Sequence, residues 1–414
     1  MATTSTEEAL MPQVWAGVDV GKEHHHCVVI DTDGTRVLSR RVRNDEADLR
    51  ALISDVAALG SPVTWAIDLV GGPAMLLITL LAEHAALVLY LPGRLVHRAA
   101  ETYRGEGKTD ARDAAVIADQ ARMRRDLQPV RVADELVAQL RMVTRRREDL
   151  VADRVRTVNR LRGLLLEYFP ALERAFTWAR SPNALVLLRG FRTPAEIRSV
   201  TRSQLVSWLK VHNVRNADAI ATRAISAAEQ QSVAVPGEQV AADLVRHLVR
   251  MLTALDEEIR DLDGWLKRLL EQHDQAVLLA SMPGVGPQLA AELLVSSGGD
   301  VLTFGSPDRL ASVAGLAPVP RDSGKVSGNL HRPQRYSRRL QRAFYLSAMA
   351  ALIHCPTSKA FYQRKRDEGK SHVQALLALA RRRVNVMWAL IRDECLYQAN
   401  RTLGVGPAAS RSAV

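Results

Sequence analysis

Four aspartates in the first third of the chain have the residue type and setting of ligands for a divalent metal ion. Asp19 lies inside the apolar run Val14–Val20, and Asp68 ends a second apolar run. An acid inside an apolar strand is costly without a partner. Asp110 and Asp113 are three residues apart at a predicted helix start, so they share one helix face. Carboxylate oxygens suit Mg²⁺, and two such ions about 3.5–4 Å apart could clamp the attacking and leaving oxygens of a phosphodiester.

A serine in the last third of the chain is a candidate nucleophile for the same chemistry. Ser323 precedes a glycine, and Arg321 and Lys325 stand two residues to either side of it. A serine hydroxyl can attack phosphorus when a base or metal takes its proton and cations stabilise the phosphorane. Ser327, also followed by glycine, is the alternative nucleophile, and taken alone the segment is an ordinary Ser-Gly loop.

The net charge of +11 is concentrated around this loop. The segment Pro318–Arg366 contains eleven basic residues and one acid, which is +10 of the total, so the rest of the chain is nearly neutral. The spacing predicts a helix with four arginines on one face: Arg335, Arg338, Arg339 and Arg342. The opposite face is apolar: Leu340, Phe344, Ala348 and Ala351. Because no acid follows these arginines at i+4, we expect the face to bind nucleic-acid phosphates with a strong salt dependence.

A short turn, Pro283–Gly286, joins two predicted helices that are rich in small residues. The arrangement resembles a helix-hairpin-helix module, in which glycines let backbone N–H groups approach a DNA phosphate without reading bases. Gly284 and Gly286 are therefore candidate DNA contacts. The alternative is an ordinary tight turn between helices.

Three consecutive histidines, His24–His26, lie on a predicted strand. Neighbouring side chains on a strand point to opposite faces, so these imidazoles cannot converge on one ion. We predict no metal site among them.

The elements that must position the acids follow an α/β order. Strands are predicted at Val14–Val20, His25–Ile30, Thr35–Val42, Val63–Asp68 and Leu87–Leu91. Helices are predicted from a cap at Asn44 to Leu59, then at Pro73–His84, Val96–Tyr103 and Asp110–Arg125. Three strands in a meander, then alternating helix and strand, is the order of an RNase H-like domain. Such a sheet places its first strand centrally, beside the strand that carries Asp68, and the four acids could then converge.

The middle third is predicted to be helical and elongated. Heptad positions from Leu136 to Tyr168 are mostly apolar, which is typical of a coiled coil with an imperfect seam. A second apolar series occupies Leu244, Leu248, Met251, Leu255, Ile259, Leu262, Leu266 and Leu269. The two helices could pair as an antiparallel arm or form a dimer seam. Shorter helices are predicted at Arg202–Val211 and Ala217–Glu229.

The fold class is therefore α/β plus α, in five parts. These are a flexible N-terminus at 1–13, an α/β domain at 14–130, a coiled-coil and oligomerisation domain at 131–275, a helical C-terminal domain at 276–403 with the serine loop, and a disordered tail at 404–414. The three cysteines form no C-x-x-C pair, and the N-terminus has no apolar run of a signal peptide. The longest uncharged run, 17 residues at 275–291, is broken by prolines and glycines. We expect a cytoplasmic protein without membrane contact.

The chain resembles the DEDD transposases of insertion sequences that recombine DNA through a serine under the guidance of a bridge RNA, a family that includes the Piv pilin-gene invertase. The resemblance covers most of the chain. It lies in GVDVGK at 17–22, KTDARDA at 108–114, PGVG at 283–286, GLAP at 315–318 and RDSG at 321–324. The KTDxxDA string and the Ser-Gly loop, in this order and spacing, are the specific motifs.

The resemblance implies a RuvC-like N-terminal domain whose acids Asp19, Asp68, Asp110 and Asp113 bind Mg²⁺, with two ions per site. It implies a C-terminal transposase domain that supplies Ser323 as the nucleophile. It also implies dimers and tetramers formed through the coiled coil, in which the acids of one subunit meet the serine of another. A noncoding bridge RNA would select donor and target DNA, in the bacterial cytoplasm at the nucleoid. The family usually has Glu as its second acid, whereas this chain has Asp68.

A serine–phosphate ester conserves the energy of the broken bond, so strand exchange needs no ATP. Accordingly, the chain contains no GxxxxGK[ST] phosphate loop. Three alternatives share part of the pattern: an actin-like or sugar-kinase ATPase, a RuvC-like Holliday-junction nuclease with water as nucleophile, and a non-catalytic nucleic-acid-binding scaffold.

Overall fold

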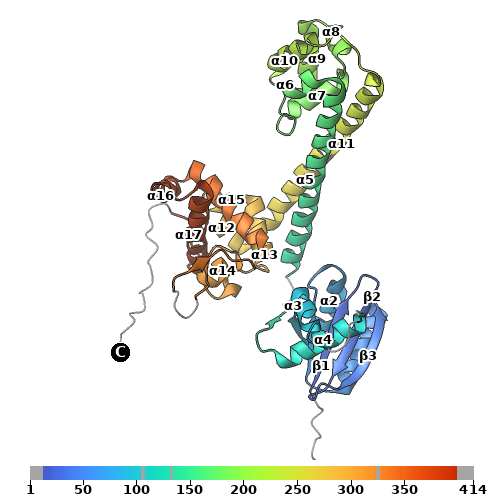
Figure 1. Ribbon diagram of the computed structural model, residues 1–414, viewed down its shortest axis with the longest axis vertical. Coiled ribbons are helices and arrows are strands. Elements are labelled where there is room, and N and C mark those ends of the chain that lie inside the picture. Colours follow the sequence, from blue (N-terminus) through green and yellow to red (C-terminus); the bar gives the residue numbers. More distant parts are fainter. Residues whose placement is uncertain (1–12, 104–106, 108, 131–133, 323–326, 399–414) are drawn as a thin grey trace, which may run out of the picture. The chain divides into compact units, whose positions relative to one another are not determined.

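The chain divides into two compact units, residues 1–132 and 133–414. The computed structural model (Figure 1) describes residues 13–103, 107, 109–130, 134–322 and 327–398. The tail predicted at 404–414, and all of the N-terminus predicted at 1–13 except Gln13, lie outside the described residues.

The first unit is a six-stranded sheet with helices (Figure 1). Its strands are β1 (Val14–Val20), β2 (His24–Ile30), β3 (Arg36–Arg43), β4 (Val63–Ile67), β5 (Leu87–Tyr90) and β6 (Gln128–Pro129). Its helices are α1 (Glu46–Leu59), the 3₁₀ turn η1 (Gly72–Ala74), α2 (Met75–Glu83), α3 (Gly93–Ala100) and α4 (Asp110–Met123). The strand order is β3-β2-β1-β4-β5-β6, with β1, β4 and β5 parallel and the other pairs antiparallel. The predicted central place of the first strand, beside β4, is confirmed, and the arrangement is consistent with a RuvC-like domain.

Helices cover both faces of this sheet. On one face, Val14, Ala16 and Val18 of β1 share a core with the buried leucines of α1 and α2. On the other face, Val28 and Ile30 of β2 pack against α4. Gly17 makes the second contact possible, because a Cβ at this position would lie 2.3 Å from the backbone of α4. The close approach of α4 to β1 therefore depends on a glycine in the strand.

The predicted starts of α1, α2 and α3 differ from the structure, and α2 begins at Met75, two residues after the predicted Pro73. Asp45, not Asn44, caps α1, and its carboxylate accepts a hydrogen bond from the backbone N–H of Asp48 at 3.0 Å. Asn44 instead donates its side-chain amide to the carbonyl of Pro73 at 3.0 Å. Helix α3 begins at Gly93, three residues before the predicted Val96, with Pro92 as its N-cap.

The second unit is built on two long helices, α5 (Glu135–Tyr168) and α11 (Glu238–Leu270), which lie side by side (Figure 1). Arg147 of α5 forms an ion pair with Asp263 of α11, and Arg154 pairs with Asp256. A step of seven residues forward on α5 thus matches a step of seven backward on α11, so the helices are antiparallel. Of the two arrangements left open by the sequence, this one is present within a single chain. The knobs-into-holes packing of a coiled coil stays a prediction.

The apolar series predicted for α11 is only partly the face that packs. Leu266 and Leu269 are buried as predicted, but Leu244 is 49% exposed and Met251 is 40% exposed. The buried residues of the N-terminal half of α11 are instead Ala242, Val245, Val249 and Leu252. This face continues through Asp256 and Asp263, which pair with α5. Because aspartates are polar, they interrupt the apolar periodicity of this face. The hydrophobic pattern therefore identified a neighbouring stripe.

Separate cores form at the two ends of this helix pair. One contains the C-terminal half of α5 and the start of α11 with α6 (Pro170–Ala175), α7 (Pro182–Gly190), α8 (Pro194–Arg198), α9 (Arg202–Val211) and α10 (Ala217–Glu229). The bounds predicted for α9 and α10 are those observed.

The other core joins the opposite ends of α5 and α11 to the C-terminal helices. These are α12 (Asp274–Ala280), α13 (Pro287–Ser296), the 3₁₀ turn η2 (Val301–Phe304), α14 (Pro307–Val313), α15 (Arg338–His354), α16 (Pro356–Asp367) and α17 (His372–Arg392). Two short exposed strands, β7 (Val319–Pro320) and β8 (Leu330–His331), lie between α14 and α15 in the sequence. The predicted domain boundary at residue 276 stays a prediction. No helix in the described part of the chain is long and apolar enough to cross a membrane.

Candidate active site and nucleic-acid interface

Asp19 lies near the end of the central strand, on the face that α4 covers. Side chains alternate along a strand, so Asp19 is on the same face as Gly17, whose missing Cβ makes room for Ala114 and Ala118 of α4. Asp19 is two residues beyond Gly17, in the direction of the strand end. A strand from the core of the sheet therefore carries this carboxylate to the edge of the α4 contact.

Asp68 follows the neighbouring strand at the same level. Val18 and Ile67 are partners in the parallel β1–β4 register, so Asp19 and Asp68 are the next residues on adjacent strands. The Asp68 carboxylate accepts a hydrogen bond from the backbone N–H of Val20 at 3.4 Å. Burial and the negative charge of Asp113 raise the pKa of Asp68, although its hydrogen bonds oppose this shift. The ionised form of Asp68 is therefore less favourable in the folded chain than in water.

Asp110 and Asp113 occupy the first turn of α4. Thr109 caps this helix by accepting a hydrogen bond from the backbone N–H of Arg112 at 3.2 Å. The charge of Asp113 acts on Asp68, and the charge of Asp110 acts on His26, the β2 partner of Asp19. All four predicted acids are thus brought to one end of the sheet, on its α4 face.

The donor set fits a divalent cation in its chemistry. Carboxylate oxygens are the preferred ligands of Mg²⁺, and a cation would offset the burial and the charge of Asp113, which together raise the pKa of Asp68. Within the described residues, however, no three such side chains already surround one point at ligand distances. Binding of an ion at this end of the sheet would therefore require the carboxylates to come closer together than they are in this structure.

The histidines alternate between faces, as predicted. His25 is 1% exposed and lies on the face opposite to α4, whereas His26 is on the α4 face and its Nε2 lies 3.0 Å from Ser39 Oγ. Burial lowers the pKa of His26, and the charge of Asp110 opposes this shift. The place of His26 beside the acids does not follow from the run of three histidines as a group. The signal that could have found it is the hairpin register, which pairs His26 with Asp19.

A second residue missed by sequence analysis is Arg112, inside the KTDARDA string. Its guanidinium donates to the carbonyls of Gly107, Ala100 and Tyr103 at 2.7, 3.0 and 3.1 Å. Arg112 thus ties the end of α3 and the following segment to the helix that carries Asp110 and Asp113.

The serine loop is closed at its base by a small hairpin. Strands β7 and β8 pair, and beyond them the backbone N–H of Arg321 donates to the carbonyl of Asn329 at 2.8 Å. The Asp322 carboxylate accepts from the backbone N–H of Asn329 at 3.0 Å. Ser323 and Lys325 lie outside the described residues, and Ser327 is exposed. The hairpin holds together the two ends of the segment that contains both candidate serines.

The two glycines of the Pro283–Gly286 turn have different surroundings. Gly284 has a φ of +81°, and a Cβ there would lie 2.7 Å from the backbone N of Ala351 in α15. Buried Arg383 also holds this turn, because it donates to the carbonyl of Pro283 at 2.6 Å. Gly286 is exposed at the start of α13, and a Cβ there would meet no atom of the described residues within 4 Å. Gly286, but not Gly284, therefore has the open space that a close DNA phosphate needs.

The basic helix differs from its prediction at its start. Helix α15 begins at Arg338 with Ser337 as its N-cap, so Arg335 precedes the helix and does not share its face. The predicted apolar face is confirmed, since Leu340, Phe344, Ala348 and Ala351 are buried.

No acid stands at i+4 from these arginines within α15, but acids of neighbouring helices pair with two of them. Arg339 Nη2 lies 2.7 Å from Glu148 Oε2, and Arg342 Nη1 lies 3.9 Å from Glu148 Oε1. Glu148 belongs to α5, so the spacing within α15 could not reveal the pairing. Arg335, Arg338 and Arg342 are exposed.

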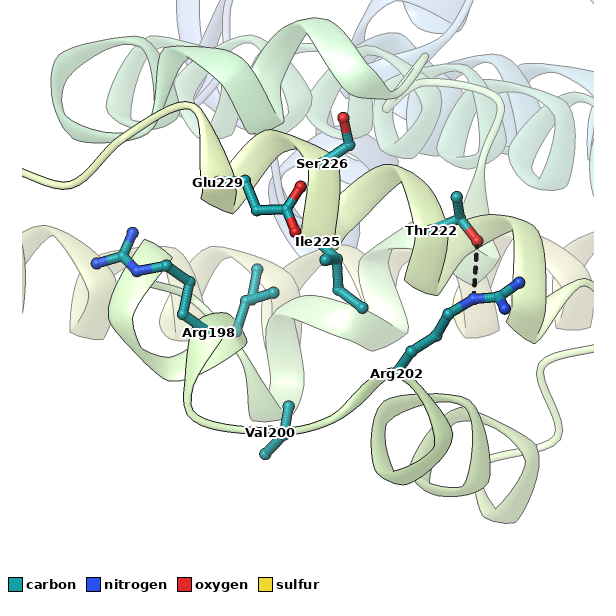
Figure 2. A pocket seen from close by; sticks show the side chains of 8 residues that line it. Arg198, Val200, Arg202, Thr222, Ile225, Ser226 and Glu229 are labelled. Atoms are coloured by element: carbon teal, nitrogen blue, oxygen red, sulfur yellow. Dashed lines mark hydrogen bonds between the residues drawn. The ribbon is translucent and has the colours of Figure 1, made fainter.

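An open groove of about 470 Å³ lies among α8, α9 and α10 of the second unit (Figure 2). Its two arginines are engaged within the chain. Arg202 donates to Thr222 Oγ1 at 3.3 Å and to the Asp218 carboxylate at 2.8 Å, and Arg198 donates to the carbonyl of Ala228 at 2.9 Å. The groove contains none of the predicted site residues.

Two segments match known transposase families. Residues 16–170 match a DEDD transposase family, and residues 276–363 match the family described as transposase IS116/IS110/IS902. An uncharacterized 42 kDa protein of insertion element IS900 from Mycobacterium paratuberculosis is 53% identical over 391 residues, which is 94% of this chain and 98% of the relative. An uncharacterized 44.8 kDa protein of IS116 from Streptomyces clavuligerus is 49% identical over 93% of this chain and 96% of its own length. The pilin gene-inverting protein of Moraxella bovis is 30% identical over 167 residues, 40% of this chain and 50% of that protein.

Proposed function

The chain belongs to the IS116/IS110/IS902 family of transposases, and from this premise we propose that it exchanges DNA strands through a covalent bond between Ser323 and a DNA phosphate. As a transposase of an insertion sequence it is an enzyme that transfers DNA strands. The observation that carries the proposal is the placement of four aspartates at one end of the sheet, in a chain whose net positive charge surrounds a Ser-Gly loop.

The carboxylates Asp19, Asp68, Asp110 and Asp113 are the proposed metal ligands. Mg²⁺, with two ions per site, would supply positive charge to the phosphate oxygens and lower the pKa of an attacking hydroxyl. The chain itself provides the scaffold. β1 and β4 hold Asp19 and Asp68 in register, and the Thr109 cap and Arg112 hold the first turn of α4. Asp68 replaces the family's usual Glu with a shorter side chain at a half-buried position.

In the proposed step, Ser323 Oγ attacks phosphorus and loses its proton. A new O–P bond forms, one P–O bond to deoxyribose breaks, and the leaving sugar oxygen takes a proton. The energy of the phosphodiester is conserved in the serine ester, so a second DNA hydroxyl can reverse the step on a new strand. Cationic side chains near the serine would stabilise the phosphorane charge.

Donor and target DNA are the proposed partners of the basic segment. The residues assigned to phosphate contact are Gly284, Gly286, Arg321, Lys325, Arg335, Arg338, Arg339 and Arg342. The open position of Gly286 and the exposure of Arg335, Arg338 and Arg342 support this assignment. Gly284 would act indirectly, because it fits the turn against α15.

A bridge RNA and homo-oligomers complete the proposal, which places the protein in the bacterial cytoplasm at the nucleoid. The long helices α5 and α11 are the proposed oligomerisation element. Two exposed apolar residues of α11, Leu244 and Met251, support this role. Such exposed apolar residues are suited to pairing with a second copy.

The test is the covalent adduct between protein and DNA. We expect Ser323→Ala to reduce adduct formation by about a thousandfold or more, because the variant lacks the hydroxyl that forms the ester, while binding of DNA and RNA is unchanged. Ser327→Ala is the matched control and should form the adduct at the wild-type rate. An adduct that persists in Ser323→Ala and disappears in Ser327→Ala would transfer the role to Ser327. Strand cleavage without any adduct would favour water as the nucleophile.

A further inference from the structure

Four charges meet where α5, α13 and α15 pack together in the second unit. Arg339 and Arg342 come from the first two turns of α15, Glu148 from α5 and Glu292 from α13. Arg339 lies 2.7 Å from Glu148 and 3.8 Å from Glu292, and Arg342 lies 3.9 Å from Glu148. Two positive and two negative charges cancel, so this part of the basic helix presents less charge than its sequence suggests.

The two carboxylates differ in their freedom to leave the arginines. The side chain of Glu292 is 13% exposed and that of Glu148 is 31% exposed. Burial, together with the charge of Glu148, raises the pKa of Glu292. Arg339 and Arg342 are 49% and 72% exposed, so both guanidinium groups reach solvent. Glu148 is therefore the acid whose side chain can change conformation and leave the arginines, which remain accessible to solvent.

A carboxylate and a phosphate occupy the same positions around arginine. Both accept charge-assisted hydrogen bonds from the planar guanidinium, often two at once. Glu148 contacts one arginine with each of its oxygens, since Oε2 faces Arg339 and Oε1 faces Arg342. A backbone phosphate that reaches these two arginines must take the place that Glu148 occupies.

We propose that Glu148 is a specificity-determining residue that occupies a DNA phosphate position on Arg339 and Arg342 and must be displaced when DNA binds. This rests on the proposed role of the basic helix in binding DNA. Displacement reduces the affinity for every duplex. Tight binding then requires other contacts with the DNA in addition to those of α15. The acid thus limits retention on arbitrary DNA, which outnumbers any target site.

The experiment measures binding of a short duplex of arbitrary sequence by the full chain, without RNA or divalent metal. We expect Glu148→Gln to bind about three- to tenfold more tightly at low salt, because both arginines become free for phosphate. Each freed arginine should steepen the dependence of log K on log salt by about 0.9, measured between about 50 and 200 mM salt. Glu148→Asp keeps the charge but shortens its reach, so its affinity should lie between those of wild type and Glu148→Gln.

The matched control is Glu258→Gln. Glu258 of α11 pairs with Arg146 of α5 at 2.7 Å, so its loss also frees an arginine and changes the net charge equally. We expect its affinity to change by less than about twofold. An equal gain in both variants would reduce the effect to net charge and overturn the proposal, as would an unchanged or weaker affinity of Glu148→Gln. A folding defect would appear as a lower melting temperature, and Glu148→Asp then provides the decisive comparison.

Arg342→Gln separates this inference from the proposed function. If Arg342→Gln weakens binding and Glu148→Gln does not strengthen it, the basic helix binds DNA and only the role of Glu148 is wrong. If Arg342→Gln and Arg338→Gln both bind like wild type, the helix is no DNA contact and the proposed interface itself fails.

Discussion

At the acid site, Asp68 occupies a position in which its ionised form is unfavourable. Asp68 has a raised pKa because it is half-buried and faces Asp113, and the backbone N–H groups that it accepts from only partly oppose this shift. A carboxylate in that position is more easily protonated in the folded chain than in the unfolded chain, so its ionised form destabilises the fold. A site suited to receive a cation has this property, because the missing positive charge arrives with the ligand.

Asp68→Asn should therefore stabilise the first unit while it abolishes activity. At pH 7 without metal we expect the melting temperature to rise by about 2 °C, since the substitution removes a buried charge. Stability from a raised carboxyl pKa is present at low pH and is lost as pH rises through that pKa. The difference in melting temperature between Asp68→Asn and wild type should accordingly disappear as pH falls below the raised pKa of Asp68. Thermal melts across pH measure this.

Asp33→Asn is the control for that comparison, because Asp33 is exposed in the turn before β3. It removes the same charge without changing a buried group, and we expect no rise in melting temperature. A melting temperature of Asp68→Asn that is lower than wild type at pH 7 would contradict the electrostatic account of this site.

At the scale of elements, glycines decide how closely helices approach their neighbours. Gly17 lets α4 lie on β1, which brings the two acids of α4 to the sheet end. Gly284 lets the turn before α13 lie on α15, the helix that carries the basic face. Gly286, two residues later, has open space where a Cβ would stand, as far as the described residues extend. One short motif thus combines a packing glycine with an open glycine.

Alanine at these two positions should separate folding from DNA binding. Gly284→Ala should lower the free energy of unfolding by about 2–4 kcal/mol, because the residue has positive φ and its Cβ would overlap the α15 backbone. Gly286→Ala should change it by less than about 0.5 kcal/mol. It should still weaken DNA binding several-fold if a phosphate approaches this backbone. Urea unfolding and duplex titration measure the two effects. Unchanged DNA binding by Gly286→Ala would leave the turn with a structural role alone.

At the scale of the whole molecule, charge specifies how the long helices pair. Arg147 and Arg154 lie in the α5 seam, where apolar residues are typical, and each meets an aspartate of α11. An apolar seam would tolerate several registers and partners, whereas these ion pairs match only when the helices are antiparallel and in this register. The same principle governs α15, where acids from α5 and α13 reduce the charge of the basic face.

Replacing one partner of a seam ion pair should lower the free energy of unfolding more than replacing both partners. Arg154→Leu leaves Asp256 part-buried without its cation, and we expect the free energy of unfolding to fall by about 1–2 kcal/mol. Arg154→Leu with Asp256→Leu should recover most of this loss, because two apolar side chains pack in the seam. A double-mutant cycle in urea measures the coupling. A double variant as unstable as Arg154→Leu would show that the pair does not determine the packing of this seam.

The sequence by itself determined the local features of this protein. The strand Val14–Val20, the helices Arg202–Val211 and Ala217–Glu229, and the apolar face of the basic helix follow from periodicity over a few residues, and the structure has them as predicted. The central position of β1 also followed, because the order of elements allows few topologies.

Only the tertiary structure decided which charges meet. Glu148 and Arg339 are 191 residues apart, and Arg154 and Asp256 are 102 residues apart. No pattern within a helix contains such pairs, so the i+4 spacing of the basic helix did not reveal its acids, and the series predicted for α11 contained apolar residues alone. The place of His26 beside Asp19 likewise depends on hairpin register. Local sequence sets the propensity of each segment, whereas ion pairing and burial depend on contacts that exist only once distant segments have packed.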